Sequence, residues 1–434
     1  MKLLIRKKSL IFFVYPGPKG SEEPTTRSGG ARRSQNQFTS AKRNGVNKLI
    51  FKRSRRKLKA INQIKYFILF LISLILSSCI AKFIPEIDEK QELLVVQGLI
   101  NDQFQPDTIK ISKSLPLGQK SAAIPVSRCS VIISDNMGNI YSLRESKAGT
   151  YITDPEIFKG EIGRLYTLHI ITNNNNNFRH YESDPVEMKP VPKIDSMYYE
   201  KVVVEQPYKF FAGVDACQIY LDTHDPENNC RFYRWDFSET WILRLLFPVV
   251  NETCWVSENS HTINIKSTAA FNESRINRFP INYISNITDR LKRKYSIQVN
   301  QYSLNEEEYN YWEKIKNISV QVGGLYDIIP ASVPSNIRCI EIPGEKVLGY
   351  FSVSAKSSKR IFIKDDFPGI IDRYNKCPTD TIGYFDPPGL GISVWILDDE
   401  PHQIPPYRIL TDNKGCADCT VRGSNIKPDY WEDK

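Results

Sequence analysis

The chain has 434 residues, with 58 Lys or Arg, 49 Asp or Glu and a formal net charge of +9. Eighteen of the basic residues but only two of the acidic ones precede Cys79, so the part from Cys79 onward carries 40 basic and 47 acidic residues, a net charge of −7. A mildly acidic protein does not attract phosphate backbones, which excludes nucleic acid as a partner.

Residues 1–57 are basic and rich in Ser, Gly, Asn and Arg, without the periodicity of a helix or a strand. Such a segment has too little apolar surface to offset the entropy of ordering the chain. No Met lies between Met1 and Cys79. We therefore expect residues 1–57 to be a non-native or untranslated extension, with translation beginning at Leu58 through a non-standard start codon.

Residues 58–78 have the order of a secretory signal: basic residues, then an apolar run over residues 66–76, then small residues. The apolar run is too short for a bilayer-spanning helix, which needs about 20 residues. The ending Leu-Ser-Ser-Cys resembles the lipobox of bacterial lipoproteins. Cys79 is therefore predicted to carry a lipid that holds the mature chain on a membrane. The alternatives are an ordinary signal peptide and a buried strand followed by a chance cysteine.

After a tether over residues 79–91, residues 92–192 contain about seven short alternating segments separated by turns rich in Asn and Gly. The segments are 93–100, 108–114, 129–135, 139–146, 149–153, 164–172 and 180–188. This number and spacing are typical of an immunoglobulin-like β-sandwich. The run of asparagines at 173–177 is interpreted as a hairpin loop.

Pro190 to Pro192 marks a boundary, after which residues 193–434 form a larger, strand-rich domain with one clear helix and a disulfide-rich tail. Segments 213–223 and 229–247 are predicted to form a hairpin, and 349–363 a pair of strands. The loop between the first two segments lacks EF-hand spacing, so it is interpreted as a turn and not as a calcium loop. Ser303 and Glu306 form a capping box before the helix. The predicted fold is therefore mainly β.

Nine cysteines are present, and eight remain after Cys79. Disulfides are expected because an exported chain enters an oxidising space. Cys416 and Cys419 have C-x-x-C spacing in a Gly- and Pro-rich tail, which favours a structural disulfide over a metal or redox site, with Cys377 as the expected partner of either. Cys217 and Cys230 flank the predicted hairpin and are expected to bridge it. Cys129 is expected to be a buried free thiol.

No catalytic set is recognisable. The five histidines show no pairing at i+2 or i+4, and no nucleophile elbow, phosphate-binding loop or dinucleotide fingerprint occurs. The acidic run at 398–400 is interpreted as a solvated turn. We therefore predict no catalytic residues, no metal and no cofactor, and we expect that the protein is not an enzyme.

Several stretches together resemble a known family. They are LLVVQGLIND (93–102), SDPVEMKPVPKIDS (183–196), FYRWDFSETW (232–241), KYSIQVNQYSLNEEEYNYW (294–312), GYFSVSAKSSKRIFI (349–363) and CADCTVRGSNIKPDYW (416–431). Their order is similar to the domain-of-unknown-function 4249 family, lipoproteins of the Bacteroidota outer membrane. The resemblance runs from about Cys79 to Trp431 and implies no catalytic residues, since the family has none established.

Members of this family are often encoded beside TonB-dependent receptors. The resemblance therefore implies an accessory lipoprotein of the outer membrane that docks on such a β-barrel and assists nutrient capture or gating. The alternative is a cell-surface glycan-binding protein or hydrolase. Whether the protein faces the periplasm or the cell surface stays open.

Overall fold

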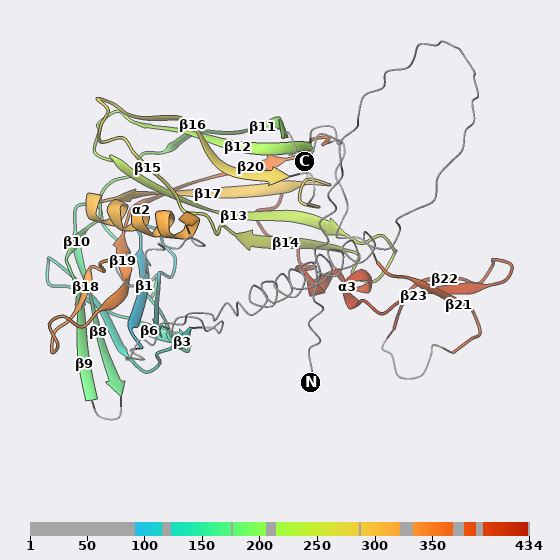
Figure 1. Ribbon diagram of the computed structural model, residues 1–434, viewed down its shortest axis with the longest axis horizontal. Coiled ribbons are helices and arrows are strands. Elements are labelled where there is room, and N and C mark those ends of the chain that lie inside the picture. The colour runs from blue at the N-terminus through green and yellow to red at the C-terminus, as the bar shows by residue number, and fades with distance from the viewer. Residues whose placement is uncertain are drawn as a thin grey trace, which may run out of the picture. The chain divides into compact units, whose positions relative to one another are not determined.

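The computed structural model describes residues 92–114, 123–174, 177–204, 214–285, 288–321, 333–367, 377–387 and 394–432 (Figure 1). All of them belong to one compact unit, Asp88–Lys434. The predicted extension, the signal segment and the tether with Cys79 lie outside the described residues. Most described residues are in strands, because apolar and polar side chains alternate along the chain and bury one face of each strand.

Two sheets form the N-terminal β-sandwich. The first has the order β19-β1-β2-β7-β6 with β3 beside β2, and the second has the order β18-β9-β8-β4-β5 with β10 beside β8. One apolar core fills the space between them and includes Val96, Ile133, Leu168 and Phe351. The strands are β1 (Leu94–Ile100), β2 (Thr108–Lys113), β3 (Ile124–Pro125), β4 (Ser130–Asp135), β5 (Ile140–Ser142), β6 (Arg144–Lys147), β7 (Thr150–Ile152), β8 (Leu165–Asn174), β9 (Asn177–Ser183), β10 (Val186–Glu187), β18 (Ile337–Cys339) and β19 (Val347–Val353).

The sandwich is not confined to residues 92–192. The chain leaves it near Pro192 and returns about 145 residues later to add β18 to one sheet and β19 to the other. β19 runs parallel to β1, from Leu94 opposite Val347 to Ile100 opposite Val353. Strand periodicity predicts that residues 349–353 are extended, but it does not indicate which sheet they join.

A second pair of sheets shares another core, which includes Ile219, Trp235, Ile297 and Val299. One sheet has the order β11-β12-β16, and the other has the order β14-β13-β17-β20 with β15 beside β13. The strands are β11 (Ile194–Val204), β12 (Val214–Asp225), β13 (Phe232–Arg244), β14 (Thr253–Asn259), β15 (Asn264–Ser267), β16 (Ser274–Ser285), β17 (Tyr295–Leu304) and β20 (Lys356–Ile363).

Two predicted strand pairings are wrong. β12 and β13 do not form a hairpin, because β11 and β16 occupy both edges of β12 and the turn after Asp225 carries the chain into the other sheet. β19 and β20 also belong to different sheets. The buried residues Ser354 and Ala355 connect them and carry the chain from the first core to the second.

The predicted helix is confirmed as α2 (Glu306–Gln321). Its N-cap is Asn305, whose Oδ1 accepts a hydrogen bond from the backbone N of Glu308 at 2.8 Å. The predicted capping box at Ser303 is wrong, because Ser303 still belongs to β17 and donates its hydroxyl to the Lys189 carbonyl at 2.6 Å. We call the second pair of sheets the second β region. α2 lies where the N-terminal sandwich and this second β region meet (Figure 1). It contacts β13 of the second β region, and Glu308 in α2 accepts a hydrogen bond from Ser352 in β19 of the sandwich.

The tail contains a small sheet with the order β21-β23-β22, followed by two short helical turns. These elements are β21 (Asp380–Gly383), β22 (Trp395–Glu400), β23 (Tyr407–Thr411), α3 (Lys414–Ala417) and η2 (Cys419–Val421). The acidic run at 398–400 is therefore strand and not turn, and Asp399 accepts a hydrogen bond from Arg408 at 2.9 Å. The prediction of a mainly β chain is confirmed. Among the described residues, no helix has the length and apolar character needed to cross a bilayer.

Candidate functional site

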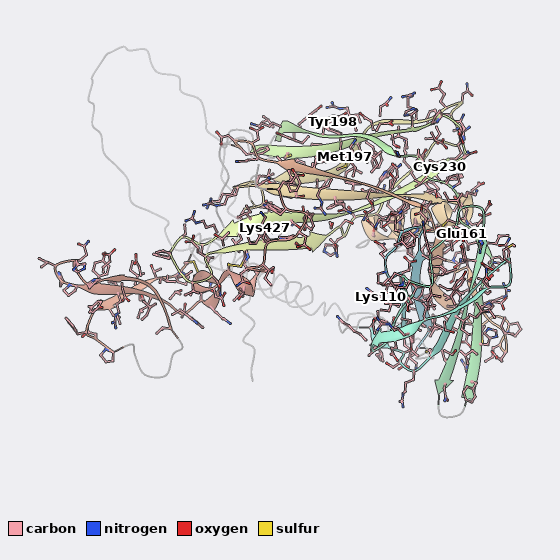
Figure 2. The ribbon with its side chains drawn as sticks, turned by 180° about the vertical axis from the view of Figure 1, so that it is seen from behind. Lys110, Glu161, Met197, Tyr198, Cys230 and Lys427 are labelled. Carbon is pink, nitrogen blue, oxygen red and sulfur yellow. A yellow bond between two sulfur atoms is a disulfide. The ribbon has the colours of Figure 1, made fainter. Side chains whose placement is uncertain are left out.

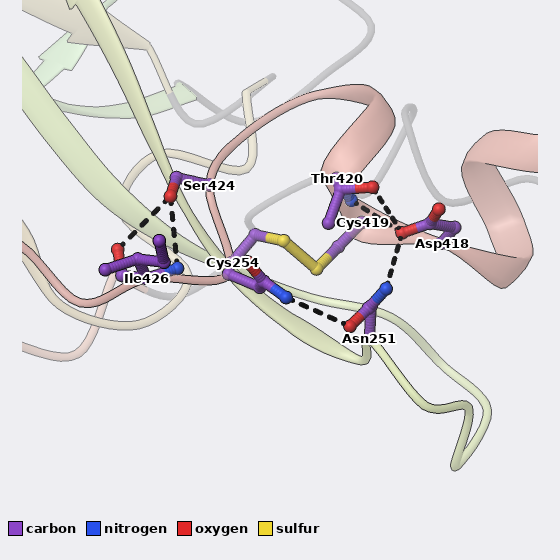
Figure 3. The surroundings of a disulfide bond; sticks show 8 residues. Asn251, Cys254, Asp418, Cys419, Thr420, Ser424 and Ile426 are labelled. Carbon is purple, nitrogen blue, oxygen red and sulfur yellow. Dashed lines mark hydrogen bonds between the residues drawn. A yellow bond between two sulfur atoms is a disulfide. The ribbon is translucent and has the colours of Figure 1, made fainter.

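The C-x-x-C pair holds the C-terminal segment to two different parts of the chain. Cys416 in α3 bonds to Cys377, the partner expected from the sequence, just before β21. Cys419 in η2 bonds to Cys254 in β14, with the two Cα atoms 5.7 Å apart (Figure 3). Cys254 had no predicted partner. Because the two cysteines have separate partners, the segment is linked covalently both to the small sheet and to the second β region.

Polar contacts fix the same segment beside its disulfide. Asp418 Oδ1 accepts hydrogen bonds from the Thr420 backbone N at 3.0 Å and from Asn251 Nδ2 at 3.1 Å (Figure 3). These bonds, above all those from Thr420, hold the pKa of Asp418 below its usual range. Further along, the backbones of Trp255 and Ser424 exchange two hydrogen bonds. The segment therefore behaves as an added edge of β14.

The last aromatic residues of the chain pack on the sheet formed by β13, β17 and β20. The Tyr430 hydroxyl lies 2.8 Å from Thr240 Oγ1, and the Arg360 guanidinium stacks 3.6 Å from the Tyr430 ring centroid. Trp431 is buried, with its ring edge-on to Phe362. Aromatic burial and cation–π stacking stabilise this packing. Lys427, at the start of this stretch, is labelled in Figure 2.

Large apolar side chains flank these contacts and stay in solvent. Val250, beside Asn251, is fully exposed, and Ile426, two residues after Ser424, is 75% exposed. Leu246 and Val421 are also exposed. Two come from the loop before Asn251 and two from the C-terminal segment, and the hydrogen bonds of Asn251 with Asp418 and Asn425 hold these two stretches together. We call these four residues the C-terminal apolar patch. Because disulfides already fix the C-terminal segment, an apolar surface on it can bind a partner with little further loss of conformational entropy.

The predicted Cys217–Cys230 disulfide is wrong. Cys217 lies near the start of β12. Cys230, labelled in Figure 2, follows the turn beyond Asp225 at the other end of the strand. At about 3.3 Å per residue the strand separates them by more than about 20 Å, and a disulfide needs Cα atoms within about 7 Å. Both are buried free thiols, and burial raises the pKa of each to about 12. A buried thiol with a raised pKa forms little thiolate, so neither cysteine is a good nucleophile near neutral pH.

Other cysteines differ in part from expectation. Cys129 is a free thiol, as predicted, but it is only half-buried. Cys339, for which no role was predicted, is a buried free thiol. Cys79, the predicted lipidation site, lies outside the described residues.

A cluster of possible metal ligands was missed from the sequence. His169 on β8 lies beside His180 and Glu182 on β9, with one ligand atom from each within 4.8 Å of the others. Its two histidines show no short sequence spacing, because they lie on two different strands. The spacing His180-x-Glu182 was the available signal, since residues two apart share one face of a strand.

A model of the family described as "Domain of unknown function (DUF4249)" matches residues 80–360. The chain belongs to the DUF4249 family. No curated protein matches the chain. The match includes β1 to β19 and the first part of β20, so β18 and β19 lie within the matched residues. It ends before Cys377, Cys416 and Cys419, so the terminal C-x-x-C stretch, which also contributed to the resemblance, lies beyond the matched residues.

Proposed function

We propose that this DUF4249 protein is a lipid-anchored, non-enzymatic accessory protein that docks on a TonB-dependent outer-membrane β-barrel and assists nutrient capture or gating. The observation that carries the proposal is the C-terminal segment, which two disulfides hold in place beside the exposed residues of the C-terminal apolar patch. The partner class comes from the family resemblance, and the membrane anchor from the resemblance of Leu-Ser-Ser-Cys, ending at Cys79, to a lipobox.

A rigid apolar surface suits binding. Exposed apolar patches on folded proteins mark contact sites for partners, and rigid surfaces lose little conformational entropy on binding. A lasting interface buries about 1,200–2,000 Å² in total, so polar residues around the patch must contribute as well. Anchoring both proteins in one membrane raises their effective concentration and lowers the affinity that the interface must supply.

The docking surface is tested by the double variant Val250→Asp, Ile426→Asp in the full chain. Two charges in the patch should sharply reduce the amount of β-barrel that co-purifies from native membranes in mild detergent, because burying unpaired carboxylates is costly. The matched control is Ile157→Asp, Ile162→Asp, which adds two charges at exposed apolar positions of the sandwich. The control should retain the barrel.

Equal loss in both double variants would exclude the patch as the docking surface. If the wild-type protein brings down no barrel and instead hydrolyses a glycan or an ester, the hydrolase alternative replaces the proposal. Cys79→Ala tests the anchor separately: the protein should leave the outer-membrane fraction, and any uptake it supports should weaken.

A further inference from the structure

The histidine cluster lies on the outer face of the sandwich sheet that contains β18, β9, β8 and β4. Leu168 and Ile170 on β8, and Tyr181 on β9, are buried in the sandwich core. Side chains alternate between the faces of a strand, so His169 on β8 and both His180 and Glu182 on β9 point to the opposite face. All three are half-buried, which leaves them open to a solvent ion.

Strand register brings the three ligands together. His169 and Glu182 are directly opposite each other on β8 and β9, and His180 lies two residues before Glu182 on the same face. The two imidazole rings have centroids 5.7 Å apart. His169 Nδ1 lies 3.6 Å from Glu182 Oε2. Two ligand atoms bound tetrahedrally at about 2.0–2.1 Å from zinc are about 3.4 Å apart, so this pair needs almost no movement to share an ion.

Two neighbouring residues, Ser134 and Arg338, orient His169 and Glu182 by contacting the ligand atoms that do not face the proposed metal. Ser134 Oγ on β4 lies 2.9 Å from His169 Nε2, which leaves Nδ1 to face Glu182. Arg338 Nη2 on β18 donates to Glu182 Oε1 at 2.8 Å, which leaves Oε2 to face His169. Protein zinc sites commonly orient their histidine and carboxylate ligands through such second contacts. β18 comes from the later part of the chain, so the arrangement requires the completed sandwich.

Charge around the cluster favours a cation. Arg338 is shared between Glu182 and Asp184, whose Oδ1 lies 2.5 Å from its Nη1. Glu341 adds a third carboxylate beside His180, accepting the backbone N–H of that residue at 2.8 Å. Three carboxylates against one guanidinium leave a negative field at the imidazoles.

We propose that His169, His180 and Glu182 bind a divalent transition-metal ion of the zinc class, with solvent in the remaining coordination position. Two imidazole nitrogens and one carboxylate oxygen are a donor set that suits zinc, whereas calcium and magnesium prefer oxygen ligands alone. The site is separate from the C-terminal apolar patch and does not depend on the docking proposal.

The test is a calorimetric titration of the metal-freed full chain with Zn²⁺, and separately with Ca²⁺. The wild-type protein should bind one Zn²⁺ per chain with a melting temperature that rises on binding, and it should bind Ca²⁺ far more weakly. His169→Ala and His180→Ala should each weaken Zn²⁺ binding by at least about tenfold, and Ser134→Ala should weaken it by a smaller factor. The matched control, His261→Ala with His402→Ala, removes two exposed histidines elsewhere and should bind as the wild type does.

Melting temperatures without metal show whether each variant is folded. The proposal is overturned if the wild type binds no stoichiometric Zn²⁺, if a folded His169→Ala, His180→Ala double variant binds as tightly as the wild type, or if the control loses affinity equally. If either histidine variant fails to fold, Ser134→Ala decides, since unchanged affinity in that variant would contradict the geometry. Equal affinity for Ca²⁺ would refute the zinc class.

Discussion

Glu308 is a buried carboxylate, and within the described part of the chain only one of its oxygens is hydrogen-bonded. Its Oε1 accepts hydrogen bonds from the Ser352 hydroxyl at 2.6 Å and from Trp312 Nε1 at 3.1 Å. Its Oε2 has no hydrogen-bond partner among the described residues. Burial raises the pKa of Glu308, although the nearby Arg234 guanidinium, stacked on Trp312, opposes the shift. The protonated form is therefore favoured in the folded protein relative to the unfolded chain.

A raised carboxyl pKa makes the folded state lose stability as the pH rises from the ordinary value of Glu, about 4.5, through the folded value. Glu308→Gln removes this titration and keeps an oxygen for Ser352 and Trp312. The free energy of unfolding of the variant, relative to wild type, should therefore increase between pH 4 and pH 8 in urea denaturation. Glu307→Gln, at the exposed neighbouring position, is the control and should show no such trend. A pH-independent difference for Glu308→Gln would contradict the argument.

Single residues were predictable from the sequence where local chemistry decides their role. The partner of Cys416 was narrowed to Cys377 because few cysteines lie near the tail. The Cys217–Cys230 bridge failed because the distance between them depends on which sheet each strand joins. His169 and Glu182 were not connected for the same reason, since only strand register places them opposite each other.

At the scale of elements, the parallel pair β1–β19 depends on one glycine. Gly349 has φ +92°, and a Cβ at this position would overlap the carbonyl oxygen of Val96 on β1. Gly138 has a similar φ of +86° in a turn, with no atom near its missing Cβ. Alanine is strained at both positions, but only at Gly349 does it also push two strands apart.

We therefore expect Gly349→Ala to lower the free energy of unfolding by about 1–3 kcal/mol more than Gly138→Ala does, because overpacking adds to the backbone strain. Chemical denaturation of the two variants and the wild type measures this difference. Similar losses in both variants would mean that β19 can move away from Val96 at little cost.

Strands themselves were largely predictable, and their partners were not. Alternation along residues 229–247 and 349–363 predicts extended chain correctly. A hairpin is the default for two consecutive strands, but the connections after β12 and β19 cross between sheets. Buried small residues such as Ser354 and Ala355 give little local signal for such a crossing, because they also suit a strand interior.

For the whole molecule, the shared sandwich makes the two halves of the chain depend on each other. A fragment of residues 92–192 lacks β18 and β19, and with them Val347 and Phe351 of the core. It should show no cooperative unfolding transition in urea by circular dichroism, since the exposed core and sheet edges lose most of their stabilising contacts.

The control is the same fragment extended by a long Gly/Ser linker and residues 333–355, which restores both strands. This version should unfold cooperatively. Cooperative unfolding of the shorter fragment with equal stability would show that residues 92–192 form an independent domain, as the sequence alone suggests.

During synthesis, β1 is made long before β19, the strand that pairs with one of its edges. Val347, the partner of Leu94, is made about 250 residues later, which at about 5–20 residues per second is a delay of roughly 12–50 s. Until then one edge of β1 has no neighbour and can pair with a strand of another chain. Aggregation during expression should therefore originate from unfinished chains. Keeping nascent chains apart from one another matters most until residues 347–353 have been made.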